Sequence, residues 1–407
     1  MQRRKGRKGA APVIIRTMER SAGGGGHEPL VRSRTFPLLA AYWSFGQFWG
    51  VWVILVLEFQ RHHSLTDSHL GLLYSLLSVA AIATMLAGAP RLQRLALRAS
   101  VPLSLACLAL AALALAIGPT TMLVVTFVLV GIGNGLIDVY VNVAATREER
   151  QTRRPVLQWL HASYALGGVT GAAAAGALLT VDLDHRLGLA ASGVALLATA
   201  WWNARRASPE PAAEGATALL SVSALRRSPG LWIPALTVLF CFLVEGSMDI
   251  WSGLYLREEL GASPAAAGAA FVAFAGSLFV GRLFAARALF GLGPRMTIVI
   301  AGIGGGVGGT IAVLADTTLV VAAAFLVMGF AMSAAGPAGF SLVEEVSDDP
   351  NAIAAVATVG YTGFVWSPPL LGWIADTVDL RAAMAVIVLA TVGITATGLF
   401  AREKTRT

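Results

Sequence analysis

Residues 231–256 read LWIPALTVLFCFLVEGSMDIWSGLYL, an apolar run that is long enough to cross a membrane as a helix and carries two carboxylates near its middle. Glu245 and Asp249 are four residues apart, so they share one face of that helix. A charged side chain at the bilayer centre costs at least ~2.5 kcal/mol on insertion scales, so it persists mostly where it faces a cavity, finds a partner or binds a proton. The stretch therefore predicts a membrane helix that lines a transport pathway.

The composition agrees with a chain that lies mostly in lipid. Of the 407 residues, 56% are hydrophobic and 13% are charged, which is too apolar for a soluble protein of this length. The apolar runs approach or exceed the ~20 residues of a spanning helix and are far longer than the ~10 of a barrel strand. They predict an all-α integral membrane protein with twelve transmembrane helices. These lie at residues 36–60, 68–89, 99–118, 120–145, 156–180, 186–204, 231–257, 262–285, 294–314, 317–343, 350–375 and 380–401.

Basic residues predict the orientation. With the N-terminus in the cytoplasm, 26 of the 30 Lys and Arg residues fall on the cytoplasmic side of these spans. The other four, Arg61, Arg186, Arg257 and Arg381, fall outside. This asymmetry favours cytoplasmic N- and C-termini, and it accounts for the net charge of +7 without a nucleic-acid partner.

The longest internal connection, residues 205–230, divides the spans into six and six. We expect bundles at 35–204 and 231–401, a disordered basic cytoplasmic tail at 1–34 and a short cytoplasmic tail at 402–407. Features recur across the divide at nearly constant spacing: Gly131 and Gly329 are 198 residues apart, and Tyr164 and Tyr361 are 197 apart. Such repeats predict two six-helix bundles with pseudo-twofold symmetry and a binding site between them.

Several motifs carry a resemblance to a known family. They are GIGNGLIDVYVN at 131–142, HASYALGGVTG at 161–171, EGSMDIW at 245–251, YLR at 255–257, GRL at 281–283, GYTG at 360–363 and PPLLG at 368–372. In this order the chain resembles the major facilitator superfamily, and within it a bacterial branch related to fucose-permease-like sugar transporters. The resemblance implies alternating access between two bundles, a cavity lined by spans one, four, seven and ten, and a small sugar-like solute taken up by symport.

The loops that follow spans two and eight depart from the family pattern. Residues 88–94 and 281–295 contain arginines but lack the acid that the family usually has there. We therefore expect Arg91, Arg94 and Arg282 to gate the pathway through contacts with helix ends.

Three carboxylates are the predicted proton-coupling residues: Glu245, Asp249 and Asp138. Like charges one helical turn apart resist simultaneous ionisation, which suits a proton carrier. In span four, Asn134, Asp138 and Asn142 follow at i, i+4 and i+8 and form one polar stripe, with both asparagines as candidate solute ligands. The alternative for each acid or amide is a structural hydrogen bond to a neighbouring helix.

Aromatic residues and an amide are the other candidate solute ligands. Trp43 and Gln47 share a face of span one, and the glycines at 46 and 50 leave room for a solute or for a closely packed helix. An indole beside an amide suits a polar ring such as a sugar. Trp251 and Tyr361 are candidates of the same kind. The alternative for each is an interfacial anchor or a packing residue.

The sequence thus predicts a monomeric secondary transporter, not an enzyme, in a bacterial plasma membrane, with protons and a small organic solute as partners and no cofactor or metal. Neither a nucleotide-binding lysine motif nor a zinc-protease motif occurs in it. Proton-coupled symport is the first expectation. Proton-driven efflux of a drug or metabolite uses the same carboxylates, and a membrane sensor that transports nothing is the alternative of another class.

Overall fold

Every element in the computed structural model is helical over the residues that it describes, 35–92, 97–152, 156–206, 223–349 and 351–401. The first part of the chain forms α2 (Thr35–His62), α3 (Asp67–Leu92), α4 (Leu97–Ile117), η2 (Thr120–Met122), α5 (Leu123–Thr152), α6 (Val156–Thr180) and α7 (His185–Arg206). The second part forms α8 (Ser223–Arg227), η3 (Pro229–Leu231), α9 (Trp232–Glu258), α10 (Pro264–Leu314), α11 (Thr318–Met332), α12 (Ala335–Val346), α13 (Ala352–Thr377) and α14 (Leu380–Phe400). Both predicted tails and most of the predicted central loop lie outside the described residues.

Within the described part of the chain, eleven helical segments are long and apolar enough to cross a membrane. The 26-residue helix α13 is the predicted span outside this set. Tyr361, Trp366 and the Pro368-Pro369 pair lower its hydropathy, although its length is sufficient for a span. The number of twelve spans therefore stays a prediction.

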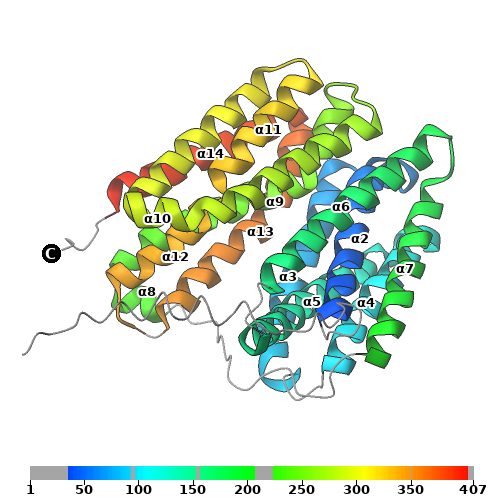
Figure 1. The fold of residues 1–407 in the computed structure, drawn as a ribbon. Helices are drawn as coiled ribbons and strands as arrows, with labels where there is room; N and C mark the ends of the chain where they lie inside the picture. The colour runs from blue at the N-terminus through cyan, green and yellow to red at the C-terminus, as the bar shows by residue number, and fades with distance from the viewer. Residues whose placement is uncertain (1–34, 93–96, 153–155, 207–222, 350, 402–407) are drawn as a thin grey trace, which may run out of the picture.

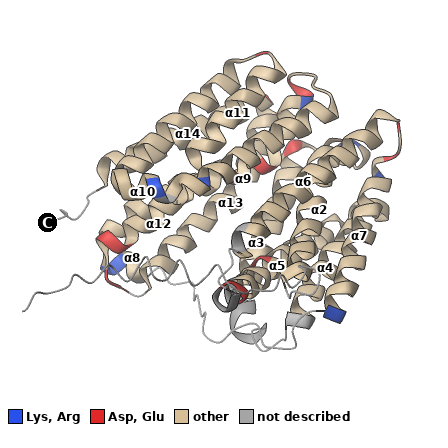
Figure 2. Ribbon diagram, viewed as in Figure 1, with Lys and Arg blue, Asp and Glu red and all other residues tan. Residues whose placement is uncertain are grey.

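The helices form two groups that meet along a shared interface (Figure 1). In one group α2 packs against α6 and α7, and α3 packs against α5; in the other, α9 packs against α13 and α14, and α10 against α11. The groups meet chiefly where α3 contacts α13 and α6 contacts α10. Figure 2 shows that most charged residues lie near helix ends, so the two groups present largely uncharged helix middles.

Equivalent contacts occur in both groups at the repeat spacing that the sequence suggests. A β-carbon on Gly131 would lie 2.3 Å from the carbonyl oxygen of Leu77, and one on Gly329 would lie 2.5 Å from that of Phe274. Close helix contacts of this kind need glycine, because any side chain would collide with the neighbouring backbone. The same aromatic contact also recurs: Phe45 meets Tyr164 at 5.3 Å and Phe242 meets Tyr361 at 5.5 Å between ring centroids. Pseudo-twofold symmetry of the whole fold stays a prediction.

Two helices differ in continuity from the predicted spans. Span ten was expected as one helix, whereas α11 ends at Met332 and α12 begins at Ala335, since Pro337 has no N–H to continue the helical hydrogen bonds. Spans eight and nine instead form the single element α10, interrupted at Gly293, whose φ of 77° lies in the left-handed region. Pro294 then begins the second segment, with its φ already suited to a first helical turn.

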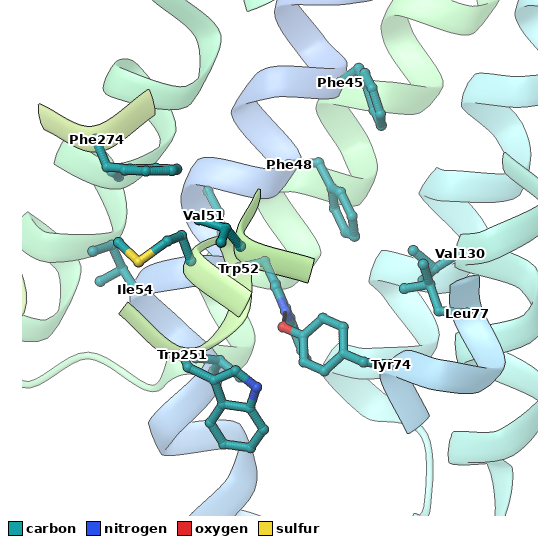
Figure 3. Packing of buried hydrophobic residues seen from close by; sticks show 14 of the residues in the cluster. Phe45, Phe48, Val51, Trp52, Ile54, Tyr74, Leu77, Val130, Trp251 and Phe274 are labelled. Atoms are coloured by element: carbon teal, nitrogen blue, oxygen red, sulfur yellow. Dashed lines mark hydrogen bonds between the residues drawn. The ribbon is translucent and has the colours of Figure 1, made fainter. Parts of the chain in front are cut away.

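Helix α2 forms its closest contact with α6. A β-carbon at Gly46 would lie 2.0 Å from the carbonyl oxygen of Tyr164, and one at Gly50 would lie 2.1 Å from that of Gly168. On another face, Trp52 Nε1 donates a hydrogen bond to the Tyr74 hydroxyl, in the aromatic part of the core that Figure 3 shows. The glycine face of α2 therefore fixes which of its other faces can line a pathway.

The two ends of the molecule can be told apart by their contacts. We call the side where α2 begins and α14 ends the terminal side, and the opposite side the distal side. Thr237, near the start of α9, bonds to Thr397, near the end of α14 (2.8 Å), which places these two ends together.

Candidate functional site

A cavity of about 370 Å³ lies between the two helix groups. Its wall draws residues from α2, α3, α5 and α6 of one group and from α9, α10 and α13 of the other. The volume is within the range of small-molecule sites. This is the location in which the sequence predicts a solute site.

Aromatic side chains make up a large part of the cavity wall. They are Tyr42, Phe45, Trp49, Tyr74, Tyr164, Phe271, Tyr361 and Phe364. Of these, only Tyr361 is a predicted solute ligand; its ring also lies 5.5 Å from that of Phe242. The sequence does contain a signal for three others, because Tyr42, Phe45 and Trp49 follow at i, i+3 and i+7 on one face of α2.

Asp249 and Glu245 lie in different surroundings although they share a helix face. Asp249 is exposed to the cavity, and no hydrogen bond or ion pair joins its carboxylate to another described residue. Glu245 is paired with Arg282 of α10, whose Nη2 lies 3.0 and 3.2 Å from the two carboxylate oxygens. Arg282 therefore acts first as the counter-ion of Glu245, a role that the sequence did not predict.

Asp138 faces the cavity from the opposite group. The Tyr42 hydroxyl donates to its Oδ1 at 3.3 Å, and Asn142 Nδ2 donates to the same oxygen at 3.0 Å and to the Asp138 carbonyl oxygen at 2.6 Å. Asn134 is part of the cavity wall, whereas Asn142 acts through Asp138. The predicted polar stripe thus divides into two residues at the cavity and one that holds the acid.

His161 completes the polar part of the wall. Its ring lies 5.8 Å from that of Tyr42 in an edge-on arrangement, so it sits beside the hydroxyl that binds Asp138. The i, i+3 relation of His161 and Tyr164 on α6 is the signal that would have placed it on the cavity face.

Three predicted solute ligands lie away from the cavity. Gln47 Oε1 accepts a hydrogen bond from Ser192 of α7 (3.0 Å), and the Trp43 carbonyl oxygen would lie 2.1 Å from a β-carbon on Gly167 of α6. The main chain at Trp43 therefore lies against α6, and the Gln47 side chain is bonded within its own helix group. Trp251 is fully buried among the hydrophobic residues that Figure 3 shows. Neither Trp43, Gln47 nor Trp251 belongs to the described cavity wall.

The predicted gate arginines can be placed only in part. Arg94 lies outside the described residues, and Arg91 lies near the end of α3 on the terminal side. Arg282 is the one of the three whose contacts are described, and these lie within its own helix group.

The distal ends of the two groups are joined by charged contacts instead. Arg257 of α9 forms a two-point ion pair with Glu58 of α2, at 2.6 and 2.7 Å. Asp376, near the end of α13, accepts hydrogen bonds from the main-chain N–H groups of Asp67 (3.0 Å) and Ser68 (2.9 Å) at the start of α3. These contacts close the interface on the distal side of the cavity.

Comparison with known proteins places the chain in a broad context. A model of the Major Facilitator Superfamily matches residues 38–348 and 250–407. An uncharacterised MFS-type transporter of Yersinia pestis is 29% identical, over 86% of this chain and 91% of the relative. Membrane protein MosC of Rhizobium meliloti is 25% identical, over 65% of this chain and 64% of its own length.

Solved transporter structures share the fold. The nucleoside transporter NupG superimposes with a TM-score of 0.76 at 13% identity, over 90% of this chain and 98% of NupG. A bacterial homologue of the human lysosomal transporter Spinster, in an inward-facing and occupied conformation, gives a TM-score of 0.69 at 14% identity, over 93% of this chain and 97% of that one. Identities this low carry the fold only.

Proposed function

The chain belongs to the major facilitator superfamily, and on that premise we propose that it is a secondary transporter whose cavity binds a small organic solute and whose Asp249 and Asp138 carry protons. The observation that carries the proposal is the pair of acids in one cavity wall, one from each helix group. A change in the charge of either acid can therefore act on the helix group that carries it.

Alternating access is supported by the distribution of contacts around the cavity. The Arg257–Glu58 pair and the Asp376 hydrogen bonds join the groups on the distal side, while the wall extends along α3 as far as Met85, toward the terminal side. We infer that the terminal side is cytoplasmic, since most basic residues of the described part of the chain lie toward that side. The conformation is then inward-facing, and transport requires the distal contacts to separate.

Proton coupling is supported by the surroundings of Asp249. A carboxylate that forms no ion pair with any described residue and lies in a largely apolar cavity has a strong reason to bind a proton. A membrane potential of 100 mV supplies ~2.3 kcal/mol for each charge moved fully across, which is enough to bias such a cycle. Glu245 is less suited to this role, because Arg282 already neutralises it.

Two candidate functions, proton symport and proton-driven efflux, differ in the direction in which the solute moves. The resemblance to sugar transporters favours proton symport of a sugar-like solute into the cell. Proton-driven efflux has a specific observation in its favour: a carboxylate without a cation partner can hold either a proton or a positively charged group, which suits exchange. The sugar-like expectation also rested on Trp43 and Gln47, neither of which belongs to the described cavity wall.

Solute-dependent pH change in proteoliposomes tests the proposal. Solutes of each charge class are added outside vesicles of known protein orientation while external pH is recorded. Symport predicts alkalinisation outside and antiport predicts acidification, in each case removed by a proton ionophore. A chain that transports solutes without any proton movement, or transports none of them, would contradict the proposal, and the latter result is what a membrane sensor predicts.

A further inference from the structure

The charge of the cavity wall is one-sided. Its ionisable residues are Asp138, Asp249 and His161, and no Lys or Arg belongs to the described wall. Arg282, which lies outside this wall, is bound to Glu245 and adds no net charge together with it. With neutral His161 and both acids ionised, the described wall carries two negative charges and no fixed positive charge.

The two acids lie on opposite sides of the space. Asp249 is on α9 of one helix group, and Asp138 is on α5 of the other. Asp138 is oriented by Tyr42 and Asn142, which donate hydrogen bonds to it, whereas Asp249 is exposed and has no such partner among the described residues. A positive group in the cavity could therefore contact Asp138, which is held in place, and Asp249, whose carboxylate has no partner among the described residues.

Aromatic faces surround the remaining space. Tyr164 and Phe45 lie in the wall on the side of the first helix group, with their ring centroids 5.3 Å apart. Tyr361 and Phe364 lie in the wall on the side of the second group. Aromatic faces attract cations through the ring quadrupole and bind apolar groups through area. Quaternary ammonium groups are recognised by aromatic cages of this composition.

We propose that the cavity selects organic cations: an ammonium or similar head between Asp249 and Asp138, with an apolar body against the tyrosine and phenylalanine rings. The proposal rests on the transport function above and names its substrate class. An anionic solute would add a third negative charge to the wall. A neutral sugar would offer neither acid a counter-ion, so each acid would need to bind a proton in a site of low polarity.

Binding to the purified full-length chain in detergent tests the proposal without a need for transport. The probes are tetramethylammonium, benzyltrimethylammonium and tetraphenylphosphonium as cations, benzoate as an anion and phenyl glucoside as a neutral sugar. Quenching of tryptophan fluorescence reports binding, since Trp49 lies in the wall. We expect at least one aromatic cation to bind at least tenfold more tightly than benzoate and phenyl glucoside.

Substitutions then locate the effect. Asp249→Asn is expected to weaken cation binding about tenfold or more, the size of losing one charge contact, whereas Asp182→Asn is not expected to change it. Asp182 lies in the turn after α6 with a φ of 54°, which asparagine adopts as readily as aspartate does. Melting temperatures near that of the wild type establish that each variant is folded. If Asp249→Asn fails to fold, the comparison of probes on the wild type decides alone.

The proposal is overturned if none of the three cations binds, if benzoate or phenyl glucoside binds as tightly as the cations, or if folded Asp249→Asn binds them like the wild type. These results differ from failure of the proposed transport function. Proton movement driven by a neutral or anionic solute would retain that function and reject the cation class. Cation binding without any solute-driven proton movement would retain the class and reject coupling.

Discussion

Arg257 of α9 and Glu58 of α2 form a two-point ion pair between the helix groups, and Arg257 also donates to the Ile54 carbonyl oxygen at 3.2 Å. Their side chains are only 11% and 22% exposed, so solvent screens this pair less than a surface pair. Opening on the distal side has to break it. The pair is therefore expected to stabilise the present conformation.

Arg257→Ala should shift the protein toward distal opening. Removal of one partner of such a pair costs about 2 kcal/mol or more, which changes the ratio of two conformations at least tenfold. Ser78→Cys, a position in the cavity wall, serves as the probe in proteoliposomes. Its reaction with an impermeant thiol reagent added on the distal side should be faster with Arg257→Ala.

The matched control for this change is Arg381→Ala. Arg381 pairs with Asp316 (3.0 Å), which is 83% exposed, and both residues lie within one helix group. Labelling of Ser78→Cys should be unchanged by it. Equal labelling rates with and without Arg257 would show that the pair does not restrain the interface.

Asp376 supplies hydrogen-bond acceptors to the first turn of α3, a helix of the other group. Asp376→Ala leaves two N–H groups without these partners and should cost about 1 kcal/mol, as the loss of an N-terminal cap does. Amide hydrogen exchange at residues 67–70 should accelerate. Asp379→Ala, which removes the cap of α14 at Ala382, should leave exchange at 67–70 unaltered. If both variants accelerate it equally, the bond across the groups has no specific role.

Close packing of α2 on α6 predicts a contrast between two glycines. Gly50→Ala places a methyl group 2.1 Å from the Gly168 carbonyl oxygen and should destabilise the protein by about 1 to 3 kcal/mol. Gly276→Ala in α10 has no neighbour within 4 Å of the added carbon and should be neutral or stabilising, by up to about 1 kcal/mol. Thermal unfolding in detergent measures both. A harmless Gly50→Ala would mean that α2 and α6 are further apart than described.

His63 lies just beyond the end of α2, and its surroundings lead us to expect that the folded protein loses stability in acid. Its burial, and then the nearby His62, His185 and Arg186, lower the pKa of His63 below its usual range. A lowered pKa means that the folded protein resists protonation, so this contribution to stability is present above the usual pKa of about 6.5 and is lost as the pH falls below it. His63→Gln should reduce the fall in melting temperature between about pH 7 and pH 5.

His69→Gln is the control for the pH measurement, since His69 is exposed in the first turn of α3. It should leave the slope of melting temperature against pH unchanged. An identical slope for His63→Gln and the wild type would exclude His63 as a source of acid sensitivity.

Hydropathy and periodicity predicted most of the helices, because the membrane imposes length and apolar character on each span separately. They also predicted polar positions in the membrane, several of which lie in the cavity wall. Which face of α2 lines that wall could not be predicted. The glycines at 46 and 50 could leave room either for a solute or for a closely packed helix. The position of α6 in the structure shows that a helix occupies this space.

The ion-pair partners of charged residues could not be predicted from the sequence either. Glu245 and Arg282 are 37 residues apart, and their pairing depends on how α10 packs against α9. The repeat spacing gave a better guide. Positions that it relates, such as Gly131 and Gly329, make equivalent backbone contacts in the two groups.

Asp249→Asn in proteoliposomes tests the central claim most directly, that this acid carries the coupled proton. The measurement is solute-dependent pH change, with the solute that gives the largest signal for the wild type and with Asp182→Asn as control. We expect the pH change to disappear with Asp249→Asn and to remain with the control. A full wild-type pH change in the folded Asp249→Asn variant would contradict the account.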